Sequence, residues 1–333
     1  MNEVTPGIYR LKSPVPGGSF NNYVNAYLVK GNDGHLLVDT GWNTEEAFNS
    51  IKEQLVETGI GFKDISQVVI THRHPDHYGL VSKLRQISPA KIALHYLEKE
   101  FLERRYTYLN EFIREMEHWL DANGLPEEEM ASFRPAALGS QRLLTPTSPD
   151  ITLRGGETVS TGLFNFKVLW TPGHAVGHIC LYEPTRKILL SGDHVLPDTT
   201  SNISLYPQQA GSNPLGDFLD SLNALRPLEI NIILPGHEEP FTDLPTRIEE
   251  LFQHHKRRKS EILEALKNKP KTTYQVATAI TWMLDRGGTS WYNLVPIDKR
   301  MAMLEAISHL ESMVVDGSID TFHENSTIYY QLS

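Results

Sequence analysis

The sequence has little of three features that would assign it to a familiar class of protein. It contains one cysteine, Cys180, so no disulfide can form within the chain and nothing indicates an oxidising compartment. No apolar run is long enough to span a bilayer, and the opening "MNEVTPGIYRLKSPV" lacks the basic and apolar regions of a signal peptide. The net charge is −10, from 31 Lys and Arg against 41 Asp and Glu, which gives no general attraction to nucleic acid or anionic membrane. We therefore predict a cytoplasmic protein without a membrane partner.

Apolar runs along most of the 333 residues predict strands separated by turns. The stretch "NAYLVKGNDGHLLVDTG" holds two such runs around a hairpin signal, and "TEEAFNSIKEQLVETG" follows it with helical spacing. Two pairs of segments repeat weakly: "HLLVDTG" resembles "KILLSGD", and "ISQVVITH" resembles "INIILPGH". Two similar β-rich halves predict two sheets that pack face to face with helices outside.

Residues 95–140 carry an apolar stripe that predicts an inserted amphipathic helix. The stripe consists of Leu102, Tyr106, Leu109, Ile113, Met116 and Leu120, and it is widened by Phe101, Tyr108, Phe112 and Trp119. Two interpretations stay open. The helix packs into the core, which the stripe favours, or it is a lid whose aromatic side lines a substrate pocket.

From about His254 the composition changes to three helical patterns and a final hairpin pattern. This is the order of a winged helix, so we predict a catalytic domain at 1–254 and a winged-helix-like domain at 255–333. Nucleic-acid binding is open but not favoured. The second domain has ten Lys and Arg against nine Asp and Glu, and its third helical pattern lacks a basic stripe.

Four side chains that can bind metals lie within the short stretch "THRHPDHYG". Side chains of an extended segment alternate, so His72, His74 and Asp76 are expected to point one way and His77 the other. One such turn can serve two metal ions. Imidazole and carboxylate ligands without a thiolate suit zinc, manganese or iron.

Four ligands are too few for two metal ions, so further ligands are expected at later strand ends. His174 in "TPGHAVGH" and His237 in "LPGHEEP" each follow Pro-Gly, which lets the backbone turn sharply. Asp193 in "SGD" can bridge two cations. His178 and His194 are expected to have structural roles.

This set of motifs resembles the metallo-β-lactamase superfamily over roughly residues 1–250. The C-terminal part is similar to that of the branch related to lactamase-beta-like endoribonucleases and glyoxalase II. The resemblance implies an αββα sandwich with a dinuclear site between the sheets. It also implies roles for individual residues: His72, His74 and His174 at one metal, Asp76, His77 and His237 at the other, Asp193 as the bridge, and Asp39 as the group that orients a ligating histidine.

Two divalent metal ions can lower the pKa of a bridging water from 15.7 toward roughly 7. Zn²⁺ is favoured here, with Mn²⁺ or Fe²⁺ as alternatives. We predict hydrolysis of a small-molecule acyl thioester, ester or lactone by a metal-bridging hydroxide, with Asp76 and Asp39 in the catalytic site. The alternatives are a single-strand-specific endoribonuclease and a mononuclear-iron sulfur dioxygenase. Tyr206 is a candidate general acid, and a homodimer stays open.

Overall fold

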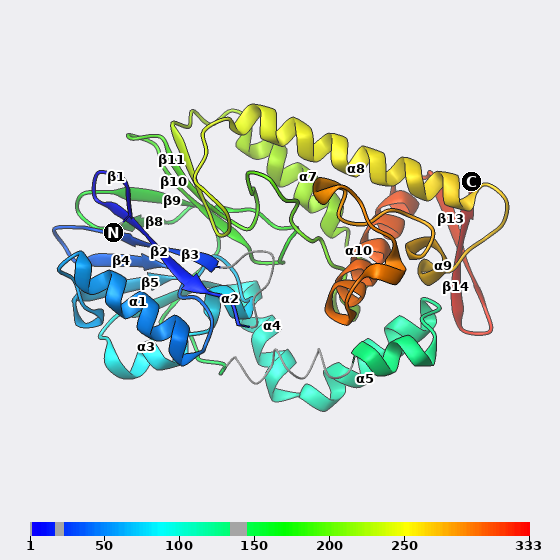
Figure 1. Cartoon of the computed structure of the whole chain (residues 1–333), viewed down its shortest axis with the longest axis horizontal. Coiled ribbons are helices and arrows are strands. Elements are labelled where there is room, and N and C mark those ends of the chain that lie inside the picture. Colours follow the sequence, from blue (N-terminus) through cyan, green and yellow to red (C-terminus); the bar gives the residue numbers. More distant parts are fainter. Residues whose placement is uncertain (1, 17–22, 134–144) are drawn as a thin grey trace.

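The computed structural model describes residues 2–16, 23–133 and 145–333 and contains two large sheets (Figure 1). In the first sheet the seven strands follow one another in chain order; β1 to β4 pair antiparallel and β4 to β7 pair in parallel. They are β1 (Asn2–Thr5), β2 (Ile8–Pro14), β3 (Tyr23–Val29), β4 (His35–Val38), β5 (Ile65–Val69), β6 (Lys91–His95) and β7 (Ile151–Leu153).

The second sheet has five strands in the order β12-β11-β10-β9-β8, all antiparallel neighbours except the parallel pair β11–β12. The weak sequence repeat corresponds to a structural one, because its segments form the parallel pair β4–β5 in one sheet and β11–β12 in the other. The strands are β8 (Thr158–Ser160), β9 (Asn165–Trp170), β10 (Ile179–Glu183), β11 (Ile188–Gly192) and β12 (Ile232–Pro235).

The two sheets pack face to face between layers of helices, which confirms the predicted αββα sandwich. Within β4, Leu36 and Val38 are buried in the core between the sheets, whereas Leu37 faces the helices outside. The alternating side chains of one strand thus contribute both to the core between the sheets and to the core beneath the outer helices. The outer helices are α1 (Glu45–Glu57), which Thr44 caps, and α3 (Val81–Ile87) on the first sheet, with α7 (Pro214–Leu225) and α8 (Leu244–Leu266) on the second. Short helices η1 (Phe62–Asp64), α2 (Pro75–Tyr78) and η2 (Pro207–Gln209) lie in the connections.

The stretch that carries the stripe forms two helices rather than the single one that it predicted, and residues 127–133 of the insertion are helical as well. Helix α4 (Tyr96–Thr107) ends where Tyr108 leaves helical geometry, with φ −115° and ψ 44°, and α5 (Leu109–Ala122) begins directly after it. The side chain of Tyr106 and residues 134–144 lie outside the described part of the structure.

Helix α5 follows the core interpretation of the stripe. Phe112, Met116 and Leu120 are buried against the C-terminal helices, and Trp119 packs partly buried against the same cluster. Tyr108 differs, because 57% of it is exposed. It lines a pocket of about 280 Å³, none of whose lining residues is a predicted metal ligand: Arg104, Tyr108, Glu111, Phe112 and Glu115.

The C-terminal part has the predicted order of helices and a hairpin, and it shares α8 with the sandwich. Residue 254, the predicted boundary, lies within this continuous helix, which Figure 1 shows running along both parts. Helix α10 packs against α7, α8, α9 and β13, and apolar residues from Ala302 to Met313 are buried in it. The two-domain division stays a prediction. The remaining elements are α9 (Thr273–Ala277), η3 (Leu284–Arg286), η4 (Trp291–Asn293), α10 (Pro296–Val315), β13 (Ile319–Glu324) and β14 (Thr327–Leu332).

In the described part of the chain, no helix combines the length and the apolar character that crossing a membrane requires.

Candidate metal centre

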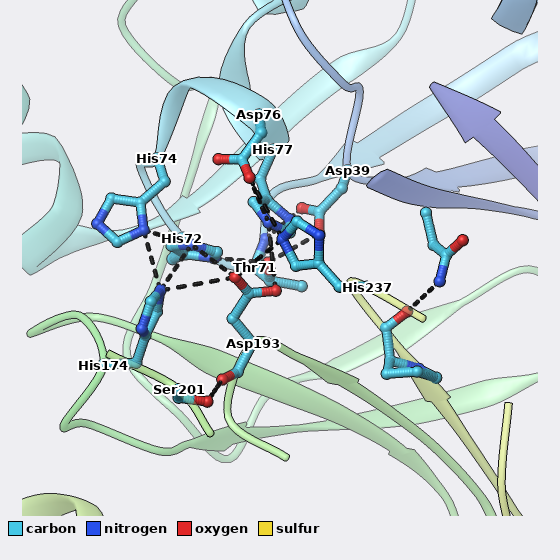
Figure 2. Close-up of polar contacts among 12 residues, drawn as sticks. Asp39, Thr71, His72, His74, Asp76, His77, His174, Asp193, Ser201 and His237 are labelled. Carbon is cyan, nitrogen blue, oxygen red and sulfur yellow. Dashed lines mark hydrogen bonds and ion pairs between the residues drawn. The ribbon is translucent and has the colours of Figure 1, made fainter. Parts of the chain in front are cut away.

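The seven predicted metal ligands come together at one edge of the sandwich, as Figure 2 shows. They follow the ends of strands from both sheets. Strand β5 leads to the four ligands of the first motif, while His174 follows β9, Asp193 follows β11 and His237 follows β12. Because β11 and β12 are parallel, their carboxyl ends deliver Asp193 and His237 to the same place.

Pro75 divides the first motif into two parts. A residue before proline is biased toward extended backbone, and His74 has φ −60° and ψ 147°. Pro75 then begins α2, a position that suits its fixed φ. The alternation that we expected therefore ends at His74, and Asp76 lies with His77 rather than with His72.

The first group of ligands consists of three imidazole nitrogens. The Nδ1 atom of His74 lies 2.9 Å from Nε2 of His72 and 2.9 Å from Nε2 of His174, and the two Nε2 atoms are 3.2 Å apart. Nitrogens that surround a tetrahedral Zn²⁺ at 2.0–2.1 Å are about 3.3 Å from one another. The spacing of the three nitrogens is thus close to that of a zinc site.

The second group contains Asp76, His77 and His237, and Asp193 lies between the two groups. Oδ2 of Asp76 is 3.3 Å from Nε2 of His237 and 3.6 Å from Nε2 of His77. Asp193 places Oδ1 3.3 Å from Nε2 of His77 and Oδ2 3.3 Å from Nε2 of His237. The same Oδ2 is 3.7 Å from Nε2 of His174 and 4.0 Å from Nε2 of His72.

Polar atoms without hydrogen bonds show that these residues fit metal ions. Among the described residues, Nε2 of His77 and Oδ1 of Asp193 are buried and have no hydrogen-bond partner. Burying such atoms unsatisfied is costly, and a cation between them removes the cost. The backbone at Gly236 also approaches the Asp193 carboxylate closely, because a Cβ atom there would lie 2.3 Å from Oδ1. Glycine before His237 is therefore required for this geometry.

The comparisons with known proteins agree with the geometry. The profile of the Metallo-beta-lactamase superfamily matches residues 20–237, which include all seven residues of the two groups and the bridge. The chain belongs to the metallo-β-lactamase superfamily.

Relatives within the superfamily share both sequence and fold with this chain. It is 30% identical over 315 residues to the "Probable metallo-hydrolase YqjP" of Bacillus subtilis (strain 168), a match that covers 92% of this chain and 93% of the relative. It is 28% identical over 229 residues to the acyl-coenzyme A thioesterase MBLAC2 of Homo sapiens, covering 66% and 75% respectively. The crystal structure of a metallo-beta-lactamase family protein from Thermus thermophilus superposes with a TM-score of 0.82 at 30% identity, over 99% of this chain and 100% of the other.

Asp39 contacts one predicted histidine ligand directly and a second one through Thr71. Its Oδ2 is 2.8 Å from Nδ1 of His77 and accepts a 2.8 Å hydrogen bond from the Thr71 hydroxyl. That hydroxyl is in turn 3.1 Å from Nδ1 of His72. A carboxylate on the far nitrogen fixes the tautomer and raises the basicity of a ligating histidine. These contacts agree with the orienting role that the resemblance implies for Asp39, and that role stays a prediction.

Two other contacts hold ligands that belong to the second sheet. Nδ1 of His174 is 2.9 Å from the carbonyl oxygen of Asn202, whose side-chain amide donates a 2.7 Å hydrogen bond to Glu305 of α10. Nε2 of His178 accepts a 3.1 Å hydrogen bond from the backbone N–H of Asp193. The structural role expected for His178 agrees with this contact. His194 is also buried, and its ring packs on those of His178 and Phe218.

Glu98 of α4 is a supporting residue that the sequence did not reveal. It is fully buried and accepts hydrogen bonds from the backbone N–H of Arg73 at 2.8 Å and of Gly177 at 2.7 Å. Nη1 of Arg73 lies 3.0 Å from both of its carboxylate oxygens. One carboxylate thus connects the loop of His72 and His74 to the loop of His174.

Charges differ between the two ligand groups in the metal-free protein. Burial, followed by the neighbouring histidines, holds the pKa values of His72 and His74 well below the usual range. Burial also opposes the charged form of His77 and His237, but Asp193 and Asp76 outweigh it. They raise the pKa of His237 to about 10 and that of His77 well above its ordinary value. At neutral pH the first group is thus uncharged, and both histidines of the second carry protons.

We expect metal uptake by the second group to release protons, because His77 and His237 must become neutral to act as ligands. Affinity at that group should fall as the pH is lowered and rise as the pH approaches about 10, the pKa of His237. Calorimetric titration of Zn²⁺ in buffers of different ionisation enthalpy measures the protons released. His237→Gln should release about one proton fewer, since one ionisable ligand is gone. Uptake of a second equivalent without proton release would contradict the expectation.

Proposed function

We propose that this metal-dependent hydrolase of the superfamily holds two divalent cations and hydrolyses acyl thioesters. The observation that carries the proposal is the position of Asp193, whose two oxygens lie 3.3 Å from the Nε2 atoms of His77 and His237 in the second group. Oδ2 also approaches the first group, at 3.7 Å from His174. A carboxylate between two sets of nitrogen and oxygen ligands fits two cations that need a shared negative charge.

Each part of the site has a separate task in the proposed reaction. His72, His74 and His174 would hold one cation and Asp76, His77 and His237 the other, with Zn²⁺ as the ion that this ligand set favours. Such cations, when bound, lower the pKa of water toward neutrality and polarise a carbonyl oxygen. Asp39 and the Asn202 carbonyl hold histidine rings in place, and Glu98 fixes the two loops that carry the first group.

A thioester suits the site because its thiolate leaves without help from a strong acid. Tyr206, the candidate general acid, lies among arginines and phenylalanines, and among the described residues no contact joins it to a predicted ligand. One of the relatives, MBLAC2, is named an acyl-coenzyme A thioesterase, which supports the same class of substrate.

The endoribonuclease alternative has less support. A winged helix binds nucleic acid by placing an exposed recognition helix in a groove. Here the corresponding helix, α10, is buried against α7, α8 and α9. The net charge of −10 also provides no general attraction for a polyanion.

The test compares turnover of acyl thioesters, simple esters, lactones and single-stranded RNA by the metal-loaded protein, together with its metal content. We expect about two Zn²⁺ ions per chain and thioester hydrolysis that is lost in Asp76→Asn. Asp198→Asn is the matched control, because Asp198 is an exposed carboxylate a few residues from the bridge. RNA cleavage without thioester turnover would overturn the proposal in favour of a nuclease. A content of one iron per chain, together with oxygen uptake when a persulfide is the substrate, would overturn the proposal in favour of a dioxygenase.

A further inference from the structure

Three buried arginines from different parts of the chain meet beside the metal centre. Arg73 lies between the ligands His72 and His74, while Arg105 belongs to α4 and Arg300 to α10. Their exposed fractions are 2%, 7% and 7%. No sequence motif connects them, since they come from the first motif, the insertion and the C-terminal part.

Aromatic rings pack against Arg73 and Arg105. The helix of Arg300 reaches the same place, because the backbone N–H of Leu205, beside Tyr206, donates a 3.2 Å hydrogen bond to the carbonyl oxygen of Leu304. The guanidinium of Arg73 is 3.7 Å from the ring centroid of Phe101 and 5.8 Å from that of Tyr206. Arg105 lies 5.3 Å from the ring of Phe112. The rings of Phe101, Phe112 and Tyr206 are 5.5 to 6.5 Å from one another. Tyr206 is thus the common neighbour of the cluster.

The positive charge of Arg300 is not balanced by a carboxylate of the described chain. Glu98, the buried carboxylate nearby, pairs with Arg73 and also accepts two backbone hydrogen bonds. Among the described residues, Arg300 makes no hydrogen bond or ion pair, and the ionisable neighbours that act on it are Tyr206 and Arg105. Burial, together with Arg105, lowers the pKa of Arg300, and Tyr206 opposes the change. Leaving a guanidinium buried in this state is costly.

Tyr206 reports the same excess of positive charge. Burial alone would raise the pKa of its hydroxyl. Arg300, Arg105 and Arg73 outweigh burial and lower that pKa below its ordinary value. The surroundings of the hydroxyl therefore favour a negative group, and a planar guanidinium binds carboxylates through two parallel hydrogen bonds.

We propose that Arg300, Arg105 and Tyr206, with Arg73 beside the metal ligands, form a subsite for a carboxylate at the far end of the substrate's acyl chain. The preferred substrates are then thioesters of dicarboxylic acids. This assignment rests on the proposed thioesterase function. The subsite belongs to three parts of the chain, so it also gives the insertion and the C-terminal part a role in selecting the substrate.

The kinetic test uses N-acetylcysteamine thioesters, whose leaving group carries no charge. Succinyl, glutaryl and adipyl thioesters are compared with butyryl, valeryl and hexanoyl thioesters of matched chain length. We expect kcat/KM to be at least about tenfold higher for the best carboxylated chain, since hydrogen bonds to charged groups are the stronger ones. Arg300→Met should remove this preference and Arg300→Lys should keep part of it. Arg257→Met, at an exposed arginine of α8, should keep it whole.

Thermal melting separates a binding role from a structural one. Because Arg300 is buried without a carboxylate partner among the described residues, Arg300→Met should leave the melting temperature of the ligand-free protein unchanged or raise it. Glutarate should raise the melting temperature of the wild-type protein and not that of the variant. A lower melting temperature with an unchanged substrate preference would make Arg300 structural and overturn the proposal.

Direct binding distinguishes failure of the subsite from failure of the proposed function. Calorimetry of glutarate with metal-loaded wild type and Arg300→Met isolates the subsite from the metal ions, which both proteins contain. Binding that depends on Arg300, without turnover of any thioester, supports the subsite and refutes the thioesterase. Thioester turnover without glutarate binding and without a preference for carboxylated chains supports the thioesterase and refutes the subsite. Two results would overturn the assignment to the acyl chain. One is a preference for coenzyme A over N-acetylcysteamine as leaving group that disappears in Arg300→Met. The other is binding of inorganic phosphate but not of glutarate.

Discussion

Asp193→Asn is expected to abolish turnover and to lower the metal content below the wild-type value. Its oxygens approach histidines of both ligand groups, so one substitution withdraws a ligand and a negative charge from each. Replacing even an outer partner of a ligand costs about 10- to 100-fold in metal affinity or activity, so removal of the shared carboxylate should cost more than about 100-fold.

Elemental analysis and the kinetics of the purified variant measure both effects. The second group should lose its metal first, because the oxygens of Asp193 lie 3.3 Å from its two histidines and 3.7 to 4.0 Å from those of the first group. Asp198→Asn, a substitution of the same chemistry at an exposed position, should keep full metal content and activity. Wild-type stoichiometry and rate in Asp193→Asn would show that this carboxylate does not bridge the ions.

Glu98→Ala is expected to destabilise the protein by about 3–5 kcal/mol, the usual effect of removing one partner of a buried ion pair. The change leaves the guanidinium of Arg73 without its carboxylate and removes the acceptor for two backbone N–H groups. Metal affinity at the first ligand group should fall as well, because the loops of His74 and His174 lose their shared support. Urea unfolding, with and without a chelator, gives the free energy of unfolding in both states.

Glu98→Gln and Glu103→Gln make the comparison specific. The first keeps the shape and an acceptor oxygen, so it should lose less stability than Glu98→Ala. The second changes a carboxylate on the same helix whose side chain is 55% exposed, and it should change stability by no more than a few tenths of a kcal/mol. Equal stability of Glu98→Ala and Glu103→Gln would mean that the buried pair contributes nothing to folding.

The sequence predicted the sandwich and the candidate ligands that the fold brings together, because both leave local signals. Alternating apolar residues predict strands such as β4, and the dense motif around His72 and His74 has few explanations other than metal binding. Even there, proline changed the outcome: Asp76 turned toward His77 because the extended backbone ended at His74.

The residues that support the site left no such signals. Glu98 meets Gly177 across 79 positions of the chain, and Asn202 meets Glu305 across 103. In the sequence, a glutamate on a polar helix cannot be distinguished from an exposed one, and only the fold shows that Glu98 is buried. The break at Tyr108 was also hidden, because the apolar spacing continues through it while the backbone does not. The boundary at residue 254 followed a change of composition, yet α8 has no glycine or proline there to end it.

The contact between Asn202 and Glu305 has a consequence for the order of events during synthesis. All the predicted ligands have been translated once His237 is added, whereas the α10 side chain that holds Asn202 comes much later. At about 5–20 residues per second, the ribosome needs on the order of seconds to cover that distance. During this interval the Asn202 carbonyl that orients His174 lacks its support from Glu305. Full metal capture is therefore expected only after α10 has left the ribosome and packed, which makes the folding of a C-terminal helix the last step in maturation of the centre.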